Sequence, residues 1–498
     1  MELLGLLLFC TVLLLTAILY LKWNGGNKLL PGPKLINILC DVPLFVTKPH
    51  VAFSKWAKTY GPIFQLRTGM RSTIVISDAR LAKELFNDYA STGRSYNPII
   101  HEFSKGAYGL INAEGESWET HRRFTLRTFR NVGFSKTSME GLILDEVRAM
   151  LERFKKFERT PISGNRIFNA PVVNSLWHIV AGERFEWESG RDSRVFRAAD
   201  DFFNSLLRVS TNGLIFAPIL RFIAPDLLGW TSFKNSIENL HQIFESTIKN
   251  HEAEVNNSNF PRDYIDYALK EIENTKDPNS SFFGIAGRTN LSSGIFDLFQ
   301  AGSETTANTL SWSLLYLSNY SEAQQRLYTE IKATVGSSRA PALSDRIKMP
   351  YTEAVIAETL RLSNVVPLGV PHRMNCDKSF NGYILPKDSI VFVNLYGILH
   401  DEQVWGDPFN FRPMRFLNED GSQYIRHESF IPFSIGKRQC IGESLVRDTL
   451  FLFITSIFQQ FEVLPHQKTE TPIYFEADNW FLLVPKTFKV VMNPRVHN

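Results

Sequence analysis

The chain has 498 residues, of which 44% are apolar and 13% aromatic, which is enough to bury a large core. Its 54 basic and 51 acidic side chains give a formal charge of +3 without a long run of one sign. This balance excludes an intrinsically disordered chain and argues against nucleic acid as a partner, because nucleic-acid-binding proteins concentrate basic charge.

The first segment is long and apolar enough to span a bilayer. The nineteen residues from Leu3 to Leu21 carry no charge, and a membrane-spanning helix needs about 20 apolar residues. A cleaved signal peptide is the alternative, but such peptides begin with basic residues and end in a small-residue cleavage site. Lys22, Lys28 and Lys34 follow the apolar run, which places the rest of the chain in the cytosol by the positive-inside rule.

A stiff linker separates this segment from the rest of the chain. The two prolines of Leu30-Pro31-Gly32-Pro33 fix their own φ angles and keep the residues before them out of helix. We therefore expect a transmembrane anchor at residues 1–22, a Pro/Gly linker at 23–34 and a single large globular domain at 35–498.

Beyond the linker, the pattern is mainly helical with a few short strands. Amphipathic helical periodicity dominates from about Asp78 to Leu362. Four short runs rich in β-branched and aromatic residues are typical of strands, namely Ile63–Arg67, Thr73–Ile76, Ile390–Asn394 and Phe488–Met492. The predicted fold class is mainly α with small β-sheets (α+β).

One helix is expected to be buried on nearly all sides. Leu291 to Tyr316 contains no proline, is bounded by polar clusters and carries apolar residues around most of its circumference. A helix that is apolar nearly all round lies inside a protein. This segment is therefore the predicted central helix of the globular domain.

Of the four cysteines, Cys440 has the surroundings expected of a metal ligand. Cys10, Cys40 and Cys376 suggest no disulfide framework, which suits a reducing compartment. Cys440 lies in a Gly-rich loop directly before a predicted amphipathic helix, Ser444–Phe458. Free N–H donors and the helix dipole at that end favour the thiolate, which is the form that binds metals. The alternative is an inert, small apolar residue.

The ten residues from Phe433 to Gly442 fit the pattern Phe-x-x-Gly-x-Arg-x-Cys-x-Gly. This pattern resembles the haem-binding signature of the cytochrome P-450 family, and the resemblance spans almost the whole chain. It implies the cytochrome P-450 fold, with Cys440 as the iron ligand of haem b and Arg438 on a haem propionate. The thiolate ligand of that family favours O–O cleavage.

A second motif lies in the apolar stretch from Ala354 to Leu368. Glu358 and Arg361 share one helix face, a spacing that alone indicates only a weak solvated ion pair. The segment is similar to the family's Glu-x-x-Arg helix, and the resemblance implies Arg415 as the third member of a structural triad. Met414 replaces the acidic residue usual beside it, which puts any additional salt bridge there in doubt.

Polar residues interrupt the predicted central helix at Ala301–Thr306. Their hydroxyls could simply bond to backbone carbonyls and bend the helix. The stretch resembles the family's acid-alcohol motif, which implies Glu304 as the acid and Thr305 as the alcohol of a proton relay to bound oxygen. Gln300 is expected either to point into the substrate pocket or to cap a polar stripe.

Further residues are candidates for the haem propionates. Trp118 and Arg122 lie on one helix face and are similar to the family's Trp-x-x-x-Arg site. His372 fits a further propionate contact, with a satisfied turn histidine as the alternative, and Lys105 is an additional candidate.

A basic patch for an acidic electron donor, or alternatively a solvated basic face, is predicted at Arg122, Arg123, Arg127, Arg130 and Lys437.

The resemblance is to the animal microsomal group and implies a monooxygenase of the endoplasmic reticulum membrane with a single N-terminal pass and a cytosolic catalytic domain. Such an enzyme inserts one atom of O₂ into a small apolar substrate such as a lipid, steroid, terpenoid or xenobiotic, using electrons from NADPH through cytochrome P-450 reductase. Two alternatives are a haem-thiolate isomerase or dehydratase acting on lipid hydroperoxides and a non-catalytic haem-binding protein. The acid and alcohol of the central helix argue against the second alternative.

The segments implied to line the substrate pocket are strongly apolar. Ile215–Leu220 either dips into the membrane surface or packs on the globule. The full set of implied lining segments is Tyr96–Ile111, Leu206–Trp230, Phe296–Thr305, Val365–Val370 and Glu476–Leu482.

Overall fold

The computed structural model describes residues 30–33, 47–68, 71–102, 104–132, 137–185, 194–215, 218–254, 260–467, 477 and 481–495. The predicted anchor lies outside the described residues, as does most of the predicted linker. Within the described ranges, no helix is long and apolar enough to cross a membrane.

Helices dominate the first half of the chain, as their sequence periodicity predicts. They are α4 (Pro49–Tyr60), α5 (Ala79–Phe86), α6 (Gly115–Val132), α7 (Thr137–Lys156), α8 (Asn169–Ala181), α9 (Arg194–Thr211), α10 (Pro225–Leu228), α11 (Trp230–Glu254), α12 (Tyr264–Asn274) and the short 3-10 helices η1 (Tyr89–Ser91), η2 (Ile100–Glu102) and η3 (Pro218–Phe222).

The second half contains the longest helix and the helix that follows Cys440. Its helices are α13 (Gly284–Asn319), α14 (Ser321–Thr334), α15 (Pro350–Ser363), α16 (Leu395–Leu399), α17 (Glu402–Trp405), α18 (Glu443–Gln460), η5 (Leu343–Lys348) and η6 (Pro413–Phe416).

Local signals explain where several of these helices begin and end. The Asp78 carboxylate accepts hydrogen bonds from Arg80 N–H and Leu81 N–H, both at 2.9 Å, and so caps α5. Helix α15 begins at Pro350, whose missing N–H is not needed at a first helical position. Helix α8 ends at Ala181, and the next residue, Gly182, adopts the left-handed conformation that terminates helices.

The largest sheet has the strand order β1-β2-β8-β5-β3. Its strands are β1 (Ile63–Thr68), β2 (Arg71–Ile76), β8 (Ile390–Val393), β5 (His372–Arg373) and β3 (Gly93–Arg94). Only β2 and β8 are parallel among these pairs. Because β3 pairs with β5, Arg94 lies directly opposite His372, two residues far apart in the sequence.

Two smaller sheets complete the described strands. The first has the order β4-β10-β9, formed by β4 (Pro161–Ser163), β10 (Lys489–Pro494) and β9 (Phe461–Pro465). The second is the hairpin of β6 (Lys378–Phe380) and β7 (Tyr383–Leu385).

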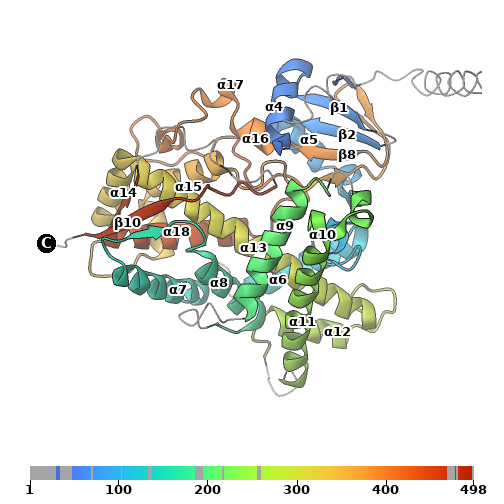
Figure 1. The fold of residues 1–498 in the computed structure, drawn as a ribbon, viewed down its shortest axis with the longest axis horizontal. Coiled ribbons are helices and arrows are strands. Elements are labelled where there is room, and N and C mark those ends of the chain that lie inside the picture. Colours follow the sequence, from blue (N-terminus) through green and yellow to red (C-terminus); the bar gives the residue numbers. More distant parts are fainter. Residues whose placement is uncertain are drawn as a thin grey trace, which may run out of the picture.

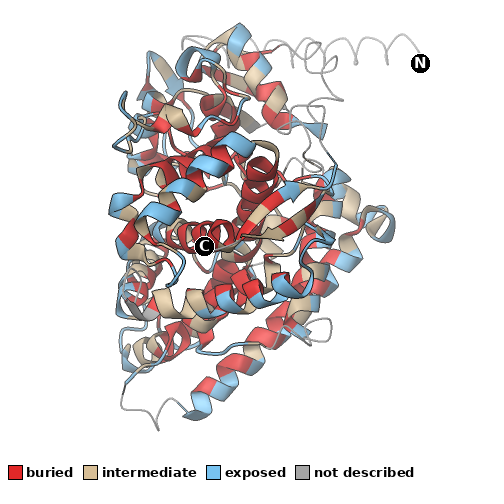
Figure 2. Cartoon of the chain, turned by 90° about the vertical axis from the view of Figure 1, so that its left-hand side faces the viewer, coloured by how far each residue is buried: buried red, intermediate tan, exposed pale blue. Residues whose placement is uncertain are grey.

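Helix α13 runs through the middle of the molecule, with the sheet of β1, β2 and β8 to one side (Figure 1). It packs against α8, α11, α15 and α18. Figure 2 shows buried residues concentrated on the interior helices, whereas the outer helices expose one face. One large apolar core spans the helical part, and smaller cores lie beside the largest sheet.

The predicted elements correspond closely to the observed ones. The mainly helical fold with small sheets is confirmed, and the four predicted strands appear as β1, β2, β8 and β10. The predicted central helix lies within α13, which begins seven residues earlier, at Gly284. The predicted helix after Cys440 lies within α18.

Candidate functional site

Backbone contacts hold the loop that presents Cys440. The Cys440 N–H donates to the Phe433 carbonyl at 3.1 Å, and the Lys437 N–H donates to the Phe86 carbonyl at 2.9 Å. Gly436 has a φ of +85°, and a Cβ there would lie 2.2 Å from the Phe86 carbonyl oxygen, so only glycine fits. The loop is thereby fixed against the end of α5, and Cys440 lies just before α18.

The second glycine of the motif has a weaker steric requirement. An added Cβ at Gly442 would meet only the Cys440 Sγ, at 3.9 Å, which is ordinary van der Waals contact. The close approach to another backbone segment therefore occurs at Gly436.

The surroundings of the Cys440 thiol act in opposite directions on its pKa. Burial raises the pKa, and the Glu443 carboxylate adds to this rise. The backbone N–H groups of Gly442 and Glu443 and the guanidinium of Arg122 lower it. Cys440 nevertheless has exposed surface area. Both observations hold if the sulfur faces an opening enclosed by protein, where a metal cation would stabilise the thiolate.

Arg438, two residues before Cys440, is buried among backbone carbonyls. Its Nε donates to the Thr92 carbonyl at 3.0 Å and its Nη2 to the Ala113 carbonyl at 2.6 Å. Its guanidinium carbon lies 3.8 Å from the ring centroid of Trp118 on α6. Burial, together with the charges of Arg94 and Arg122, lowers the pKa of Arg438 to about 7. Because a guanidinium keeps its proton in proteins, a buried cation whose hydrogen bonds go to neutral carbonyls favours an anionic ligand beside it.

The pKa values of the neighbouring basic side chains are lowered as well. Burial and the charge of Arg122 lower the pKa of Arg94 to about 10, although Glu114 and Asp297 act in the opposite direction. Burial, followed by the charges of Arg94 and Arg438, brings the pKa of His372 well below its ordinary value. The His372 Nδ1 donates to the Ser91 carbonyl at 2.7 Å. The Arg122 Nη2 donates to the carbonyl of the residue before Cys440 at 2.7 Å.

Three acids act on this cluster within the described residues, but they do not offset its burial. Glu114 raises the pKa values of Arg94 and Arg438, but its carboxylate also accepts a hydrogen bond from Arg373 at 2.6 Å. Asp297 raises the pKa of Arg94 and Glu119 that of Arg438, yet burial and the repulsion between the arginines still lower both values. A ligand with two carboxylates would supply the missing charge. The two propionates of haem fit this cluster, and the adjacent sulfur fits its iron.

The acid and the alcohol predicted on α13 have different partners. Glu304 is buried, and its carboxylate accepts hydrogen bonds from the side-chain amides of Asn169 and Asn308, both at 3.2 Å. Burial raises the pKa of Glu304. The Thr305 hydroxyl donates to the Ala301 carbonyl at 2.5 Å, so the predicted back-bonding occurs. Ala301 is exposed although the helix around it is mostly buried.

Comparison with known proteins agrees with this geometry. The family model for Cytochrome P450 matches residues 30–492. Farnesoate epoxidase of Bombyx mori is 34% identical over 93% of this chain and 94% of its own length. Cytochrome P450 2B4 of Oryctolagus cuniculus is 34% identical over 90% of this chain and 91% of its own. Cytochrome P450 2J3 of Rattus norvegicus is 34% identical over 99% and 97%.

The chain belongs to the cytochrome P450 family. Membership establishes a haem iron cofactor and monooxygenase activity as properties of this cytochrome P450. The roles of individual residues rest on the contacts described here.

The three residues of the predicted structural triad of this P450 lie in contact, with Glu358 and Arg361 fully buried and the Arg415 side chain 5% exposed. The Arg361 guanidinium donates to both Glu358 oxygens, at 2.7 and 2.8 Å, and the Arg415 Nε donates to Glu358 at 3.0 Å. Asp407 adds a second carboxylate at 3.1 Å from Arg415, and it also pairs with Arg412 at 2.8 Å. The triad joins α15 to η6.

Lys105 is not brought into contact with the arginine cluster among the described residues. Its ammonium group lies 3.8 Å from the Glu245 carboxylate of α11. Both residues line a surface cavity of about 680 Å³ between α11 and the segment around η2. A role for Lys105 on a propionate therefore stays a prediction without a supporting contact.

The predicted basic patch is divided in the structure. Arg122 turns inward toward the Cys440 loop, and Arg127 pairs with Glu271 at 2.9 Å. Lys437 lies over the Tyr89 ring, at 3.8 Å from its centroid. The other two arginines of the patch, Arg123 and Arg130, are exposed.

Sequence reasoning missed Arg94 and Asp297. Asp297 on α13 is buried and accepts hydrogen bonds from the N–H groups of Leu110 and Ile111, at 2.7 and 2.9 Å. The carbonyls of those two residues accept from Arg438 and Arg94. Asp297 thus holds the loop that positions two cluster arginines. An acid in an apolar helix was the available signal, whereas Arg94 offered none.

Gln300, the residue with two predicted roles, donates to Asp297 at 3.3 Å. This contact corresponds to the polar-stripe alternative.

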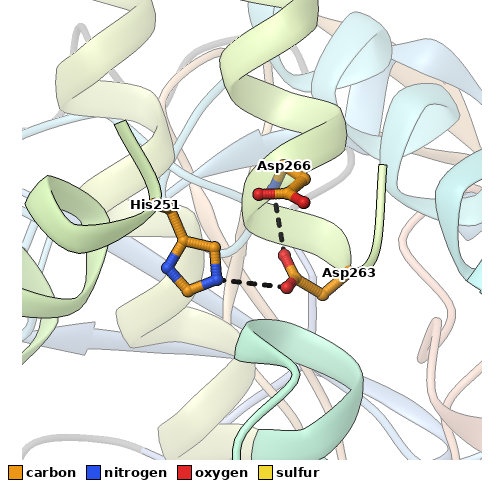
Figure 3. A group of neighbouring side chains, drawn as sticks. All are labelled: His251, Asp263 and Asp266. Atoms are coloured by element: carbon orange, nitrogen blue, oxygen red, sulfur yellow. Dashed lines mark hydrogen bonds and ion pairs between the residues drawn. The ribbon is translucent and has the colours of Figure 1, made fainter. Parts of the chain in front are cut away.

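A second polar cluster joins α11 to α12 (Figure 3). The His251 Nδ1 donates to the Thr247 carbonyl at 2.8 Å, and its Nε2 donates to the Asp263 carboxylate at 3.1 Å. The other Asp263 oxygen caps α12 through the Asp266 N–H, and Arg262 binds both oxygens of Asp266. Burial lowers the pKa of His251, but these carboxylates outweigh it and raise the pKa to about 9. A protonated histidine and an arginine occupy the positions a metal would need, so we interpret the cluster as a structural ion pair.

Proposed function

We propose that this cytochrome P450 inserts one atom of O₂ into a small apolar substrate and receives electrons from NADPH through cytochrome P-450 reductase. The observation that carries the proposal is the cluster of Arg94, Arg122 and Arg438, whose side chains donate to backbone carbonyls beside a cysteine at a helix start. Haem b, when bound, supplies the iron that activates O₂. Cys440 is the iron ligand, and the propionates are held by Arg438, Trp118, Arg122, His372 and Arg94.

In this proposal, Glu304 and Thr305 deliver protons. Burial favours the protonated form of Glu304, so its carboxyl holds a proton at a site that bulk water does not reach freely. The Thr305 hydroxyl donates to the Ala301 carbonyl and keeps its lone pairs, so in this proposal it positions the donor that carries the proton by accepting a hydrogen bond from it. An acid and a hydroxyl on successive residues suit general acid catalysis.

The substrate is proposed to be apolar. Apolar residues from α9 and α13, including Phe202 and Phe296, pack together beside the substrate-side segments. Farnesoate epoxidase is named for an isoprenoid acid, which lies within the terpenoid class predicted from the sequence. The other two relatives are equally similar and their names give no substrate, so the proposal extends to the apolar class as a whole.

Exposed apolar side chains support attachment to the endoplasmic reticulum membrane. Ile219, Phe222, Ile223 and Leu227, on and between η3 and α10, are 65 to 75% exposed. Such a patch is typical of a membrane or protein interface. It acts in this proposal together with the anchor predicted at residues 1–22, with the catalytic domain in the cytosol.

Reconstitution tests the proposed reaction. The full chain is incubated with haem, cytochrome P-450 reductase, NADPH and a panel of apolar compounds that includes terpenoid acids. We expect NADPH-dependent products that contain one oxygen atom from isotopically labelled O₂.

Two results would contradict this reaction. Turnover of lipid hydroperoxides without NADPH, together with no labelled product, would favour the isomerase or dehydratase. Stable haem binding with neither activity would favour a haem carrier.

A further inference from the structure

Glu304 is connected to charged residues of α9, the helix that leads into the substrate-side segment. The Asn169 amide at the start of α8 donates to the Glu304 Oε2 at 3.2 Å, and the Asn169 N–H donates to the Arg166 carbonyl at 3.2 Å. The Arg166 guanidinium donates to Asn204 and lies 3.7 Å from the Asp200 carboxylate. A continuous set of contacts therefore runs from α9 through Arg166 and Asn169 to the acid of α13.

The charges along this set of contacts act on Glu304 with opposite signs. Burial is the main cause of its raised pKa, Arg166 is the largest influence that lowers the pKa, and Asp200 raises it. The amides of Asn169 and Asn308 lower it as hydrogen-bond donors. Among the described charged residues, Arg166 and Asp200 thus have opposing effects on the protonation of the acid.

The backbone at Arg166 indicates that its side chain is needed there. Its φ is +60°, in the left-handed region that disfavours side chains other than those of glycine, asparagine and aspartate. A non-glycine residue in this region is held by its surroundings, and such residues are often functional. The guanidinium of Arg166 has partners only on α9 among the contacts described.

We propose that Arg166 is a positioning residue for Glu304, and that Asp200 and Asn204 of α9 control how strongly its charge acts on that acid. When Arg166 is drawn toward Asp200, Glu304 loses compensating charge and takes up a proton from solvent water. When Arg166 turns away from α9, Glu304 returns that proton and becomes a carboxylate. Substrate that displaces α9 thereby changes the state of the proposed proton donor. This inference rests on the proposed role of Glu304.

Infrared titration of the full-length holoenzyme measures the state of Glu304 directly. The carboxylic acid C=O band that disappears in Glu304→Gln belongs to this residue, and its intensity is followed against pH. Arg166→Gln should move the midpoint upward by about one pH unit, because an opposite charge is lost. Asp200→Asn should move it downward, and Arg166→Lys should stay near the wild type.

Arg148→Gln is the matched control, because Arg148 forms an exposed ion pair with Asp145 on α7 and is not among the main influences on the pKa of Glu304. Its midpoint should equal that of the wild type. Unchanged midpoints in Arg166→Gln and Asp200→Asn, or shifts of the same sign in both, would overturn the inference. If Arg166→Gln does not fold, Asp200→Asn alone tests the inference. A downward shift of its titration midpoint would support the inference, and an unchanged or higher midpoint would contradict it.

The proposed role of Glu304 is tested separately by the product formed per NADPH in Glu304→Gln. Normal coupling in that variant would contradict proton delivery by Glu304, whereas the infrared midpoints would still report whether Arg166 controls its charge.

Discussion

Two groups of buried arginines in this cytochrome P450 differ in how their charge is balanced. Arg361 and Arg415 surround Glu358, and Asp407 adds a second carboxylate. Arg438 and its neighbours bond mainly to neutral carbonyls, and burial lowers their pKa values. Among the described residues, the arginines of the first group bind carboxylates directly, whereas the side-chain hydrogen bonds of Arg438 and Arg94 go to backbone carbonyls.

The difference shows how a scaffold can be distinguished from a binding site. A buried ion pair needs partners for every charge, or it destabilises the fold. A balanced group therefore supports the structure without a ligand. An unbalanced group is expected where a ligand brings the missing charge, and haem brings two carboxylates.

Glu358→Gln should have the largest effect, because it leaves two buried arginines without their shared acid. We expect the free energy of unfolding to fall by about 3–5 kcal/mol with or without haem. Denaturant unfolding of both forms measures this loss. Glu402→Gln is the control, because Glu402 forms an exposed pair with Lys58 at 3.7 Å, for which at most about 1 kcal/mol is expected. An equal, small effect in both variants would contradict the scaffold role.

The ion pair of His251 and Asp263 should likewise stabilise the fold without haem, and its contribution to the free energy of unfolding should depend on pH. The folded-state pKa of His251 is raised from 6.5 to about 9. Its stabilisation is therefore fully present below pH 6.5 and is lost as the pH rises through about 9, and it amounts to at most about 3 kcal/mol.

Asp263→Asn should abolish this pH dependence and destabilise the protein most at low pH. Unfolding free energies measured below pH 6.5 and above pH 9 test the sign. A stability difference between variant and wild type that grows with pH would contradict the assignment.

Arg438→Met should behave in the opposite way to Glu358→Gln. Without haem, the variant should be as stable as the wild type or more stable, because a poorly compensated buried cation is removed. Haem affinity should fall about 10- to 100-fold, because a charged hydrogen bond contributes about 1.5–3 kcal/mol. Haem transfer to an acceptor protein measures the affinity. A large loss of apoprotein stability would remove the distinction between the two groups.

Asp297→Asn should have the smallest effect of the four. Asp297 acts on Arg438 through the backbone of Leu110, and on Arg94 through the backbone of Ile111 and as a nearby charge. Weakening these hydrogen bonds should cost about 1 kcal/mol, or about a fivefold loss of haem affinity. Asp420→Asn, at an exposed turn, is the control. A loss as large as that of Arg438→Met would show that Asp297 contacts the ligand site directly.

Local sequence signals predicted much of this molecule. A proline-free run that is apolar on most sides identified α13, and the Gly-rich loop identified the segment that presents Cys440. The spacing of Glu358 and Arg361, together with the family resemblance, identified their pairing. Residues joined only by long-range contacts were missed. Arg94 reaches the cluster because β3 pairs with β5, and Asp263 meets His251 across two helices. Neither arrangement leaves a pattern in neighbouring residues.

The central claim is that the thiolate of Cys440 binds haem iron. The carbon monoxide difference spectrum of the reduced protein tests it most directly. We predict a Soret band well to the red of that given by histidine-ligated haem, and its disappearance in Cys440→His while haem is still bound. A wild-type band at the histidine position, or a thiolate band that persists in Cys440→His, would contradict the account.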